Sequence, residues 1–244
     1  MVGFKHVIRA TGIVSAVTLA ASFSFSSSAS AAPSAAALYR QAIATTTAWS
    51  VHYVSTGTDS KVSDSEIGDA GPATGTQQVV IHNAGATETA SLVVFGDITY
   101  VNANASALEN LMALPPTDAT TDMNHWLQFS TSDSAFSQIV AGVKSQSVEQ
   151  ELTLKGPLTL GQSRHLDGIE VDAIRGTQAA PGTKPVHAIL YVRASGKPLI
   201  VEEDTVDAQG KPNGDERIVF SKWGERIRPK APHASITIGN VSST

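Results

Sequence analysis

Apolar and polar positions along this chain repeat with two different periods, and the change of period marks its first elements. Residues 33–49, PSAAALYRQAIATTTAW, place apolar side chains at helical spacing behind a Pro-Ser start, which predicts a helix. From residue 49 the period becomes two, so WSVHYVSTG (49–57) predicts a first strand. Residues 57–76 are rich in Gly, Asp and Ser and carry little apolar material, which predicts a loop.

Two strands and a tight turn follow this polar stretch. QQVVIHN (77–83) predicts a strand, and SLVVFGDITYVN (91–102) predicts a hairpin whose Gly96-Asp97 pair suits a type II′ turn. Apolar and polar residues do not alternate along this hairpin, because the four consecutive residues from Leu92 to Phe95 are all apolar. A strand that is apolar on both sides needs cover on both faces of its sheet.

The middle of the chain predicts helices separated by polar breaks. Residues 104–115, NASALENLMALP, predict a helix closed by two prolines, and 115–124 predict a loop. HWLQF (125–129) predicts a short extended piece. Residues 131–146, TSDSAFSQIVAGVKSQ, carry an i, i+3, i+4, i+7 apolar stripe and predict a further helix.

After residue 148 the pattern is that of strands and turns only. Three hairpin turns are expected, at Asp167-Gly168, Ser195-Gly196-Lys197 and Gln209-Gly210-Lys211. Consecutive strands joined by short turns predict an α+β protein with a curved antiparallel sheet rather than alternating βαβ units. Its helices would pack on the concave face, around an apolar core or cavity.

The first 31 residues have the order of a secretory signal peptide. Lys5 and Arg9 precede an apolar stretch from Ile13 to Phe25, and Ala29-Ser30-Ala31 fits a cleavage site. The alternative is a membrane anchor, but the apolar stretch is shorter than the ~20 residues that span a bilayer. We therefore expect export and cleavage after Ala31, a single domain over 32–244, and a secreted or periplasmic location.

Charge and cysteine content exclude several classes of partner and site. The chain carries a net charge of −5, and without the two basic residues of its first 31 the remainder carries −7. Such acidity argues against nucleic acid and anionic membrane surfaces as electrostatic partners. The chain has no cysteine, which excludes disulfides, thiolate metal sites, a Cys nucleophile and an acylated N-terminal Cys. No stable membrane anchor is expected.

No catalytic or metal-binding pattern stands out, so we expect neither an enzyme nor a cofactor. The histidines lack metal-ligand spacing, and GQSRH (161–165) lacks the closing Gly of a nucleophile elbow. In VEEDTVD (201–207), Glu202 and Glu203 would point to opposite faces of a strand and could not flank one bond. An acidic outer face on an edge strand is the simpler interpretation of these residues.

Aromatic and aliphatic residues of these elements offer two interpretations, ordinary core packing or the wall of an apolar cavity between sheet and helices. A large apolar pocket is the default binding site where no polar constellation exists. The candidate lining residues are Val94, Tyr100, Leu111, Trp126, Phe136, Ile139, Val143, Ile189, Tyr191, Phe220 and Trp223.

The order of these pieces resembles the LolA/LppX-type carrier fold (LppX/LprG-type). The resemblance rests on ALYRQAIATTTAWSVHYVSTG, LVVFGDITYVN, WLQFS before AFSQIVAGV, LDGIEVDAIRG, AILYVRASGKPLIVEED and IVFSKWGERI, and it covers nearly all of 34–230. It implies a half-barrel of about ten or eleven antiparallel strands whose concave face is closed by helices around an apolar cavity. It also implies binding of acyl chains. Many exported relatives have an acylated Cys after the signal peptide, which this chain lacks.

Three functions remain open at this point. The first is an exported, monomeric carrier of a lipid or another hydrophobic small molecule. The second is an envelope interaction or regulatory domain with a filled core and a protein partner. The third, a hydrolase, has the least support because no nucleophile or acid–base pair stands out. A continuous pocket walled by apolar side chains favours the first, and a closed core favours the second.

Overall fold

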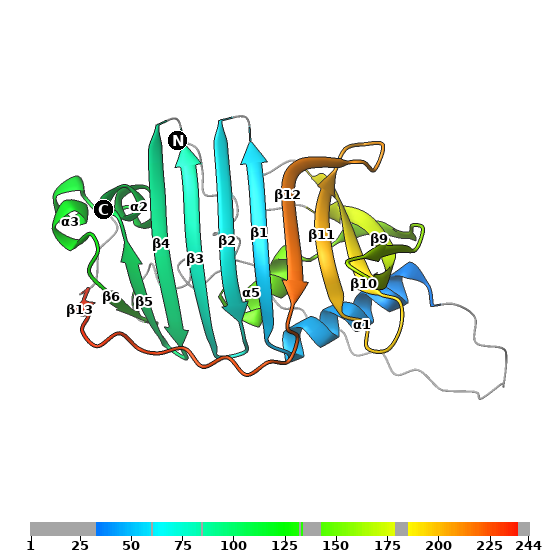
Figure 1. The fold of residues 1–244 in the computed structure, drawn as a ribbon, viewed down its shortest axis with the longest axis horizontal. Coiled ribbons are helices and arrows are strands. Elements are labelled where there is room, and N and C mark those ends of the chain that lie inside the picture. The colour runs from blue at the N-terminus through cyan, green and yellow to red at the C-terminus, as the bar shows by residue number, and fades with distance from the viewer. Residues whose placement is uncertain are drawn as a thin grey trace.

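The computed structural model describes residues 33–59, 61–83, 85–131, 133, 143–178 and 185–238, and their strands form one wide sheet (Figure 1). The predicted signal peptide and residues Phe136 and Ile139 lie outside these ranges. The strands are β1 (Val51–Asp59), β2 (Val62–Ala70), β3 (Thr74–Asn83), β4 (Ala86–Phe95), β5 (Ile98–Ala103), β6 (Leu127–Ser130), β7 (Lys155–Leu160), β8 (Arg164–Leu166), β9 (Ile169–Gln178), β10 (Val186–Arg193), β11 (Ile200–Val206), β12 (Pro212–Ser221) and β13 (Ile236–Thr237).

The sheet is open and almost entirely antiparallel. Its strand order is β13-β6-β5-β4-β3-β2-β1-β12-β11-β10-β9-β7, and β8 pairs with β9 outside this path. Only β13 and β6 pair in parallel among the described strands. The predicted class, an α+β protein with a curved antiparallel sheet, is therefore confirmed. The described sheet has thirteen strands, more than the ten or eleven expected.

Helices lie on one face of this sheet (Figure 1). They are α1 (Ala35–Ala48), α2 (Ala105–Met112), α3 (Pro116–Asp122) and α5 (Ser145–Glu151). We call the face that they cover the inner face and the opposite one the outer face.

The predicted loop at 57–76 is wrong, because it contains the end of β1, the whole of β2 and the start of β3, and β2 lies in the centre of the sheet. β2 pairs along its whole length with β1 on one side and with β3 on the other. Its side chains are mainly small or polar, so hydropathy gave no strand signal. Backbone hydrogen bonds to two neighbours hold this segment extended whatever its side chains are.

Two further predictions fail at short helices. The predicted loop at 115–124 contains α3, which begins with Pro116 at a position where the missing N–H costs nothing. Residues 148–151 were expected to be extended but end α5, which begins at Ser145, and extended structure starts only at Lys155. Both helices have seven residues, too short for a clear helical period.

The hairpin turns are where the sequence places them. Gly96 joins β4 to β5 with a φ of +56°, as the first central position of a type II′ turn requires. Asp167-Gly168 joins β8 to β9, and the turns near Gly196 and Gly210 close the β10–β11 and β11–β12 hairpins. Glycine is suited to all these positions because it adopts positive φ without strain.

Candidate functional site

The inner face carries two separate apolar clusters, each beneath its own helices. The first lies under α1 and α5 and is built mainly from β1 and β9–β12; its largest fully buried side chains are Leu152, Ile174, Leu190 and Ile200. The second lies under α2 and α3 on β3–β6, where Val94, Val101, Leu108 and Leu127 are fully buried. The sheet is wide enough that one face supports two cores side by side.

Capping residues fix the helices over these clusters. Ser34 caps α1 by accepting the Ala37 N–H at 3.3 Å, and Leu38 and Ala42 then face the first cluster. Asn104 caps α2 by accepting the Ala107 N–H at 2.9 Å. Its amide also donates to the Thr87 carbonyl at 2.7 Å, which ties the start of α2 to β4.

Each cluster is bordered by apolar side chains that are only half buried. Around the first cluster these are Tyr39, Ile43, Leu158 and Trp223, and around the second they are Ile81, Leu111, Met112 and Ile238. They pack on the buried residues yet keep exposed apolar surface. A hydrophobic ligand that covered this surface would gain about 25 cal/mol per Å² removed from water.

Between the two clusters the inner face is polar. Glu66 on β2 accepts a hydrogen bond from the Gln77 amide at 2.8 Å, and both side chains are buried. Burial, together with the charges of Asp64 and Glu216, raises the pKa of Glu66 to about 7. Burial also raises the pKa of Tyr53 well above its ordinary value, and the Glu66 charge adds to that shift.

Backbone packing closes the same central zone at two glycines. A Cβ on Gly68 would meet the Tyr53 ring at 2.6 Å, and a Cβ on Gly75 would collide with the Val143 carbonyl oxygen. The segment before α5 thus rests directly on β3. It is held there by a parallel bridge between Gly71 and Lys144 and by the Ser145 N–H, which donates to the Gly71 carbonyl at 3.1 Å.

Five of the predicted lining residues lie on the inner face, divided between the two clusters. Val94 and Val143 are fully buried in the second cluster, and Leu111 borders it. Phe220 is buried in the first cluster, with Trp223 half buried beside it at a ring distance of 6.1 Å. The structure therefore does not bring these five residues into one group.

Three of the residues predicted to line the cavity lie on the opposite face of the sheet from the helices. Tyr100, Ile189 and Tyr191 point to the outer face, because each alternates with an inner-face neighbour along its strand. Tyr100 packs edge-to-face on Phe95, with ring centroids 6.4 Å apart. Trp126 is half buried just before β6, where its carbonyl accepts the Ile236 N–H at 2.8 Å. Sequence hydropathy could not assign a face to runs that are apolar on both.

The outer face supplies its own cover for the two-sided strands β10 and β11. The β8–β9 hairpin packs Leu166 and Ile169 over a third cluster that contains Ile189 and Tyr191. Arg164 of β8 lies 3.7 Å from the centre of the Tyr191 ring. The cover that the two-sided strands require thus comes partly from the sheet's own folded edge.

The acidic run of β11 is structural, and its two glutamates do point to opposite faces. Glu202 is buried on the outer face and pairs with Arg164 at 3.2 Å and Arg217 at 2.5 Å. Glu203 is buried on the inner face and accepts from the Gln178 amide. The predicted acidic edge strand is wrong, because β11 lies between β10 and β12.

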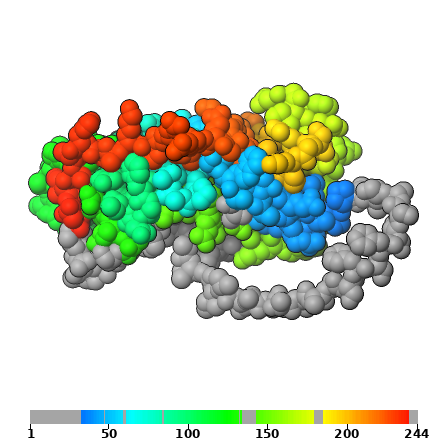
Figure 2. Space-filling model, turned by 90° about the horizontal axis from the view of Figure 1, so that it is seen from below, coloured from blue at the N-terminus to red at the C-terminus, as the bar shows by residue number. Residues whose placement is uncertain are grey.

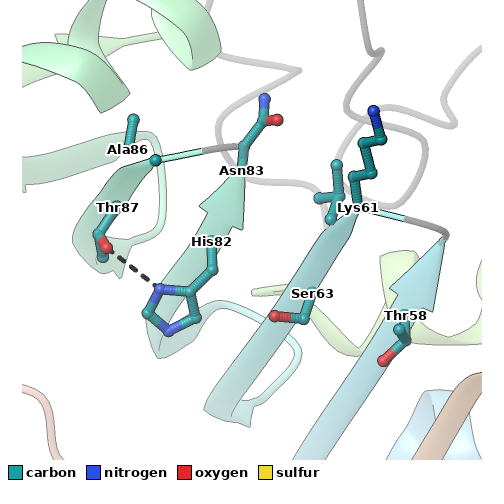
Figure 3. Close-up of a pocket in the computed structure, with 9 residues that line it drawn as sticks. Thr58, Lys61, Ser63, His82, Asn83, Ala86 and Thr87 are labelled. Carbon is teal, nitrogen blue, oxygen red and sulfur yellow. Dashed lines mark hydrogen bonds between the residues drawn. The ribbon is translucent and has the colours of Figure 1, made fainter.

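Sequence reasoning missed a polar cleft between two hairpin tips (Figure 3). It has a volume of about 490 Å³ and is lined by Thr58, Lys61, Val62, Ser63, His82, Asn83, Gly85, Ala86 and Thr87. His82 and Thr87 share a hydrogen bond of 3.1 Å across β3 and β4. The cleft could not be predicted, because one of its walls is the strand that hydropathy assigns to a loop.

Within the described ranges, no group of three or more His, Asp or Glu side chains is arranged to hold a metal ion. Among those same residues, no helix combines the length and the hydropathy needed to cross a bilayer.

Comparison with solved structures gives the fold a name. The crystal structure of LprF from Mycobacterium bovis aligns over 81% of this chain and 96% of its own, with a TM-score of 0.56 and 14% identity. The chain has the LolA/LppX-type fold. Lipoprotein LppX from Mycobacterium tuberculosis aligns over 80% of this chain and 97% of its own, at TM-score 0.47 and 19% identity.

A third alignment is with a two-protein complex. MucB of Pseudomonas aeruginosa, solved with MucA, aligns over 80% of this chain and 58% of its own, at TM-score 0.38 and 9% identity. No family model matches the chain. No curated protein matches it either.

Proposed function

We propose that this protein is an exported, non-enzymatic carrier of a hydrophobic small molecule, held between the inner face of the sheet and the helices. The observation that carries the proposal is the half-buried apolar border of the two inner-face clusters. Leu111 and Met112 of α2 and Ile43 of α1 keep apolar surface on the same side of the sheet. The LolA/LppX-type fold, established by the likeness to LprF, supports the proposal as an analogy of architecture only.

The polar centre of the inner face fits an amphipathic ligand better than a purely apolar one. An acyl chain would lie on the border of the second cluster, while a hydrogen-bonding headgroup would face Glu66 and Gln77. A headgroup that is uncharged when bound, such as a hydroxyl or a protonated carboxyl group, suits this zone, because an anion would meet the charges of Asp64 and Glu216.

Export through the signal peptide would place the carrier in the periplasmic or extracellular space. We expect the processed chain to be a monomer. It has no cysteine that could carry a lipid anchor, so we expect it to shuttle its ligand rather than stay fixed to a membrane. No catalytic step is part of the proposal.

Native mass spectrometry of the protein purified from its own host, without detergent, tests this function. We expect a co-purifying mass that extracts into organic solvent, and uptake of a fluorescent fatty acid by delipidated protein. A clean ligand-free mass together with no uptake would overturn the carrier function.

A second function, an envelope interaction domain with a filled core, is favoured by one specific observation. The Tyr53 ring over Gly68 and the Val143 backbone against Gly75 close the centre of the inner face. If this packing continued across the whole face, no ligand would enter. The ligand-free result would then support this alternative, and capture of a specific envelope protein partner would be the next measurement.

A further inference from the structure

After β12 the chain crosses one edge of the molecule as a strap, which we define as Lys222–Ile238. Its beginning is fixed to the first half of the sheet. The Gly224 N–H donates to the Ser50 carbonyl at 2.8 Å, and the Trp223 indole donates to the Ile200 carbonyl at 3.0 Å. Its end pairs with β6 as β13, at the other side of the sheet. Figure 2 shows the strap as a band along the surface of this edge.

The strap is strongly basic in a protein that is acidic overall. Residues 222–230 contain Lys222, Arg226, Arg228 and Lys230 against a single acid, Glu225, which gives them a net charge of +3. The rest of the chain therefore carries −8. All four basic side chains are exposed, and none forms a salt bridge with a residue that the structure describes.

The strap concentrates basic charge at one end of the strands. The strap runs past the start of β1 and the end of β2, where it forms a cleft of about 230 Å³ with Val51, Asp69 and Thr76. At the far end of the strands, the hairpins β1–β2 and β11–β12 carry Asp64, Asp207 and Asp215 against Lys61 and Lys211. The strap end is therefore the more basic of the two and would face an anionic surface.

An interfacial aromatic residue lies beside the strap. Trp49 is half buried at the same end of the strands; its ring is stacked under the Lys197 amine at 4.0 Å and contacts Gly224. Farther along, Ile236 exposes 43% of its surface. Tryptophan with lysine and arginine is the residue set that prefers the boundary between lipid headgroups and water.

We infer that the strap is a docking surface for the anionic phospholipid headgroups of a bilayer. The chemistry that recognises them is the row of unpaired Arg and Lys side chains, with Trp49 and Ile236 in contact with the headgroup boundary. The biological role of this docking surface rests on the proposed function, since a carrier must reach the membrane that supplies its ligand. It also refines the conclusion drawn from net charge, because the acidity is not spread evenly over the surface.

The test compares two variants with the same loss of charge. The strap variant is Arg226→Gln, Arg228→Gln and Lys230→Gln. The matched control is Lys61→Gln, Lys155→Gln and Lys211→Gln, which removes three exposed basic groups at the opposite end of the strands. Each protein, as its host exports it, is mixed with vesicles of equimolar phosphatidylcholine and phosphatidylglycerol and separated by flotation.

We expect the wild type and the control to bind these vesicles, and the strap variant to bind on the order of 100-fold more weakly. Binding of the wild type should fall as salt rises from about 50 mM to about 500 mM, because the Debye length shortens. Vesicles of phosphatidylcholine alone should retain little of any of the three proteins.

Two results would overturn the inference. One is equal binding of the strap and control variants to anionic vesicles. The other is that the wild type does not bind anionic vesicles but binds soluble polyglutamate more strongly than the strap variant does. That result would indicate an acidic protein partner instead. Fatty-acid uptake is measured on the same samples: vesicle binding without uptake keeps the docking surface and removes the carrier function, whereas uptake without vesicle binding does the opposite.

Discussion

Glu66 shows how a single buried carboxyl makes stability depend on pH. Its pKa of about 7 lies above the 4.5 of an unhindered glutamate, mainly because burial disfavours the charged form. The folded protein therefore holds a proton that the unfolded chain releases. The contribution of Glu66 to the free energy of unfolding is therefore greatest below about pH 4.5. It falls as the pH rises toward 7, and above pH 7 it is lower by up to about 3 kcal/mol.

Glu66→Gln should remove this dependence while keeping an acceptor for the Gln77 amide. We expect the variant to match the wild type near pH 4.5 and to be more stable near pH 8, by about 1–3 kcal/mol. Urea unfolding across that range measures the effect. Glu170→Gln, at an exposed site on β9, serves as the control. An unchanged slope of stability with pH in Glu66→Gln would contradict the prediction.

Leu111 is the residue at which ligand binding and folding can be separated. It is half buried on the border of the second cluster, whereas Val143 is fully buried and a larger side chain there would destabilise the fold. Leu111→Asp should reduce fatty-acid uptake about tenfold or more, because a charge replaces apolar contact surface. Ile67→Asp, on the outer face where Ile67 is 45% exposed, should leave uptake unchanged. Equal uptake in both variants would place the ligand elsewhere.

At the scale of elements, the junction between β3 and the segment before α5 holds the centre of the inner face together. Gly75 lies under the Val143 backbone, so any side chain there must displace main chain rather than a flexible tip. The sheet and the helix layer meet here through backbone contact, with no room for a Cβ between them.

Gly75→Ala should lower the free energy of unfolding by about 2–3 kcal/mol, as overpacking does in well-filled cores. Gly96→Ala provides a contrast: its added Cβ meets no atom within 4 Å, and only the positive φ causes strain. That change should cost about 1 kcal/mol. Denaturant unfolding of both variants shows which substitution lowers the free energy of unfolding more. A larger loss in Gly96→Ala would show that the junction is looser than its geometry indicates.

At the scale of the whole molecule, the two inner-face clusters are joined by the sheet and also by the strap. The strap begins beside the first cluster and ends at Ile238, which packs against the second. A segment that bridges two cores across one edge resists separation of the two halves of the sheet.

Ile238→Asp should release β13 and loosen the adjoining edge. We expect faster amide hydrogen exchange in β6, over Leu127–Ser130, with no change in β10, because local opening follows the lost contacts. Ile236→Asp, at an exposed position of the same strand, should have a smaller effect. Faster exchange across the whole sheet would mean that the strap is needed for global stability.

The predictability of the candidate site follows from the same physics. The sequence could predict that Val94, Leu111 and Val143 pack against other apolar side chains, because burial removes apolar surface from water; that they line a ligand cavity stays a prediction. The face to which Tyr100 and Tyr191 point was not predictable, since runs that are apolar on both sides carry no alternation. The Glu66–Gln77 pair gave no local signal, because its members come from different strands.

The sequence by itself determined the class of the fold, the hairpin turns and most strands, because turn chemistry and side-chain period act over a few residues. Only the tertiary structure decided that the polar segment 62–70 is a central strand, that the inner face holds two cores, and that the basic residues after β12 line one edge. Backbone pairing and contacts between distant segments fix these features, and neither depends on local hydropathy.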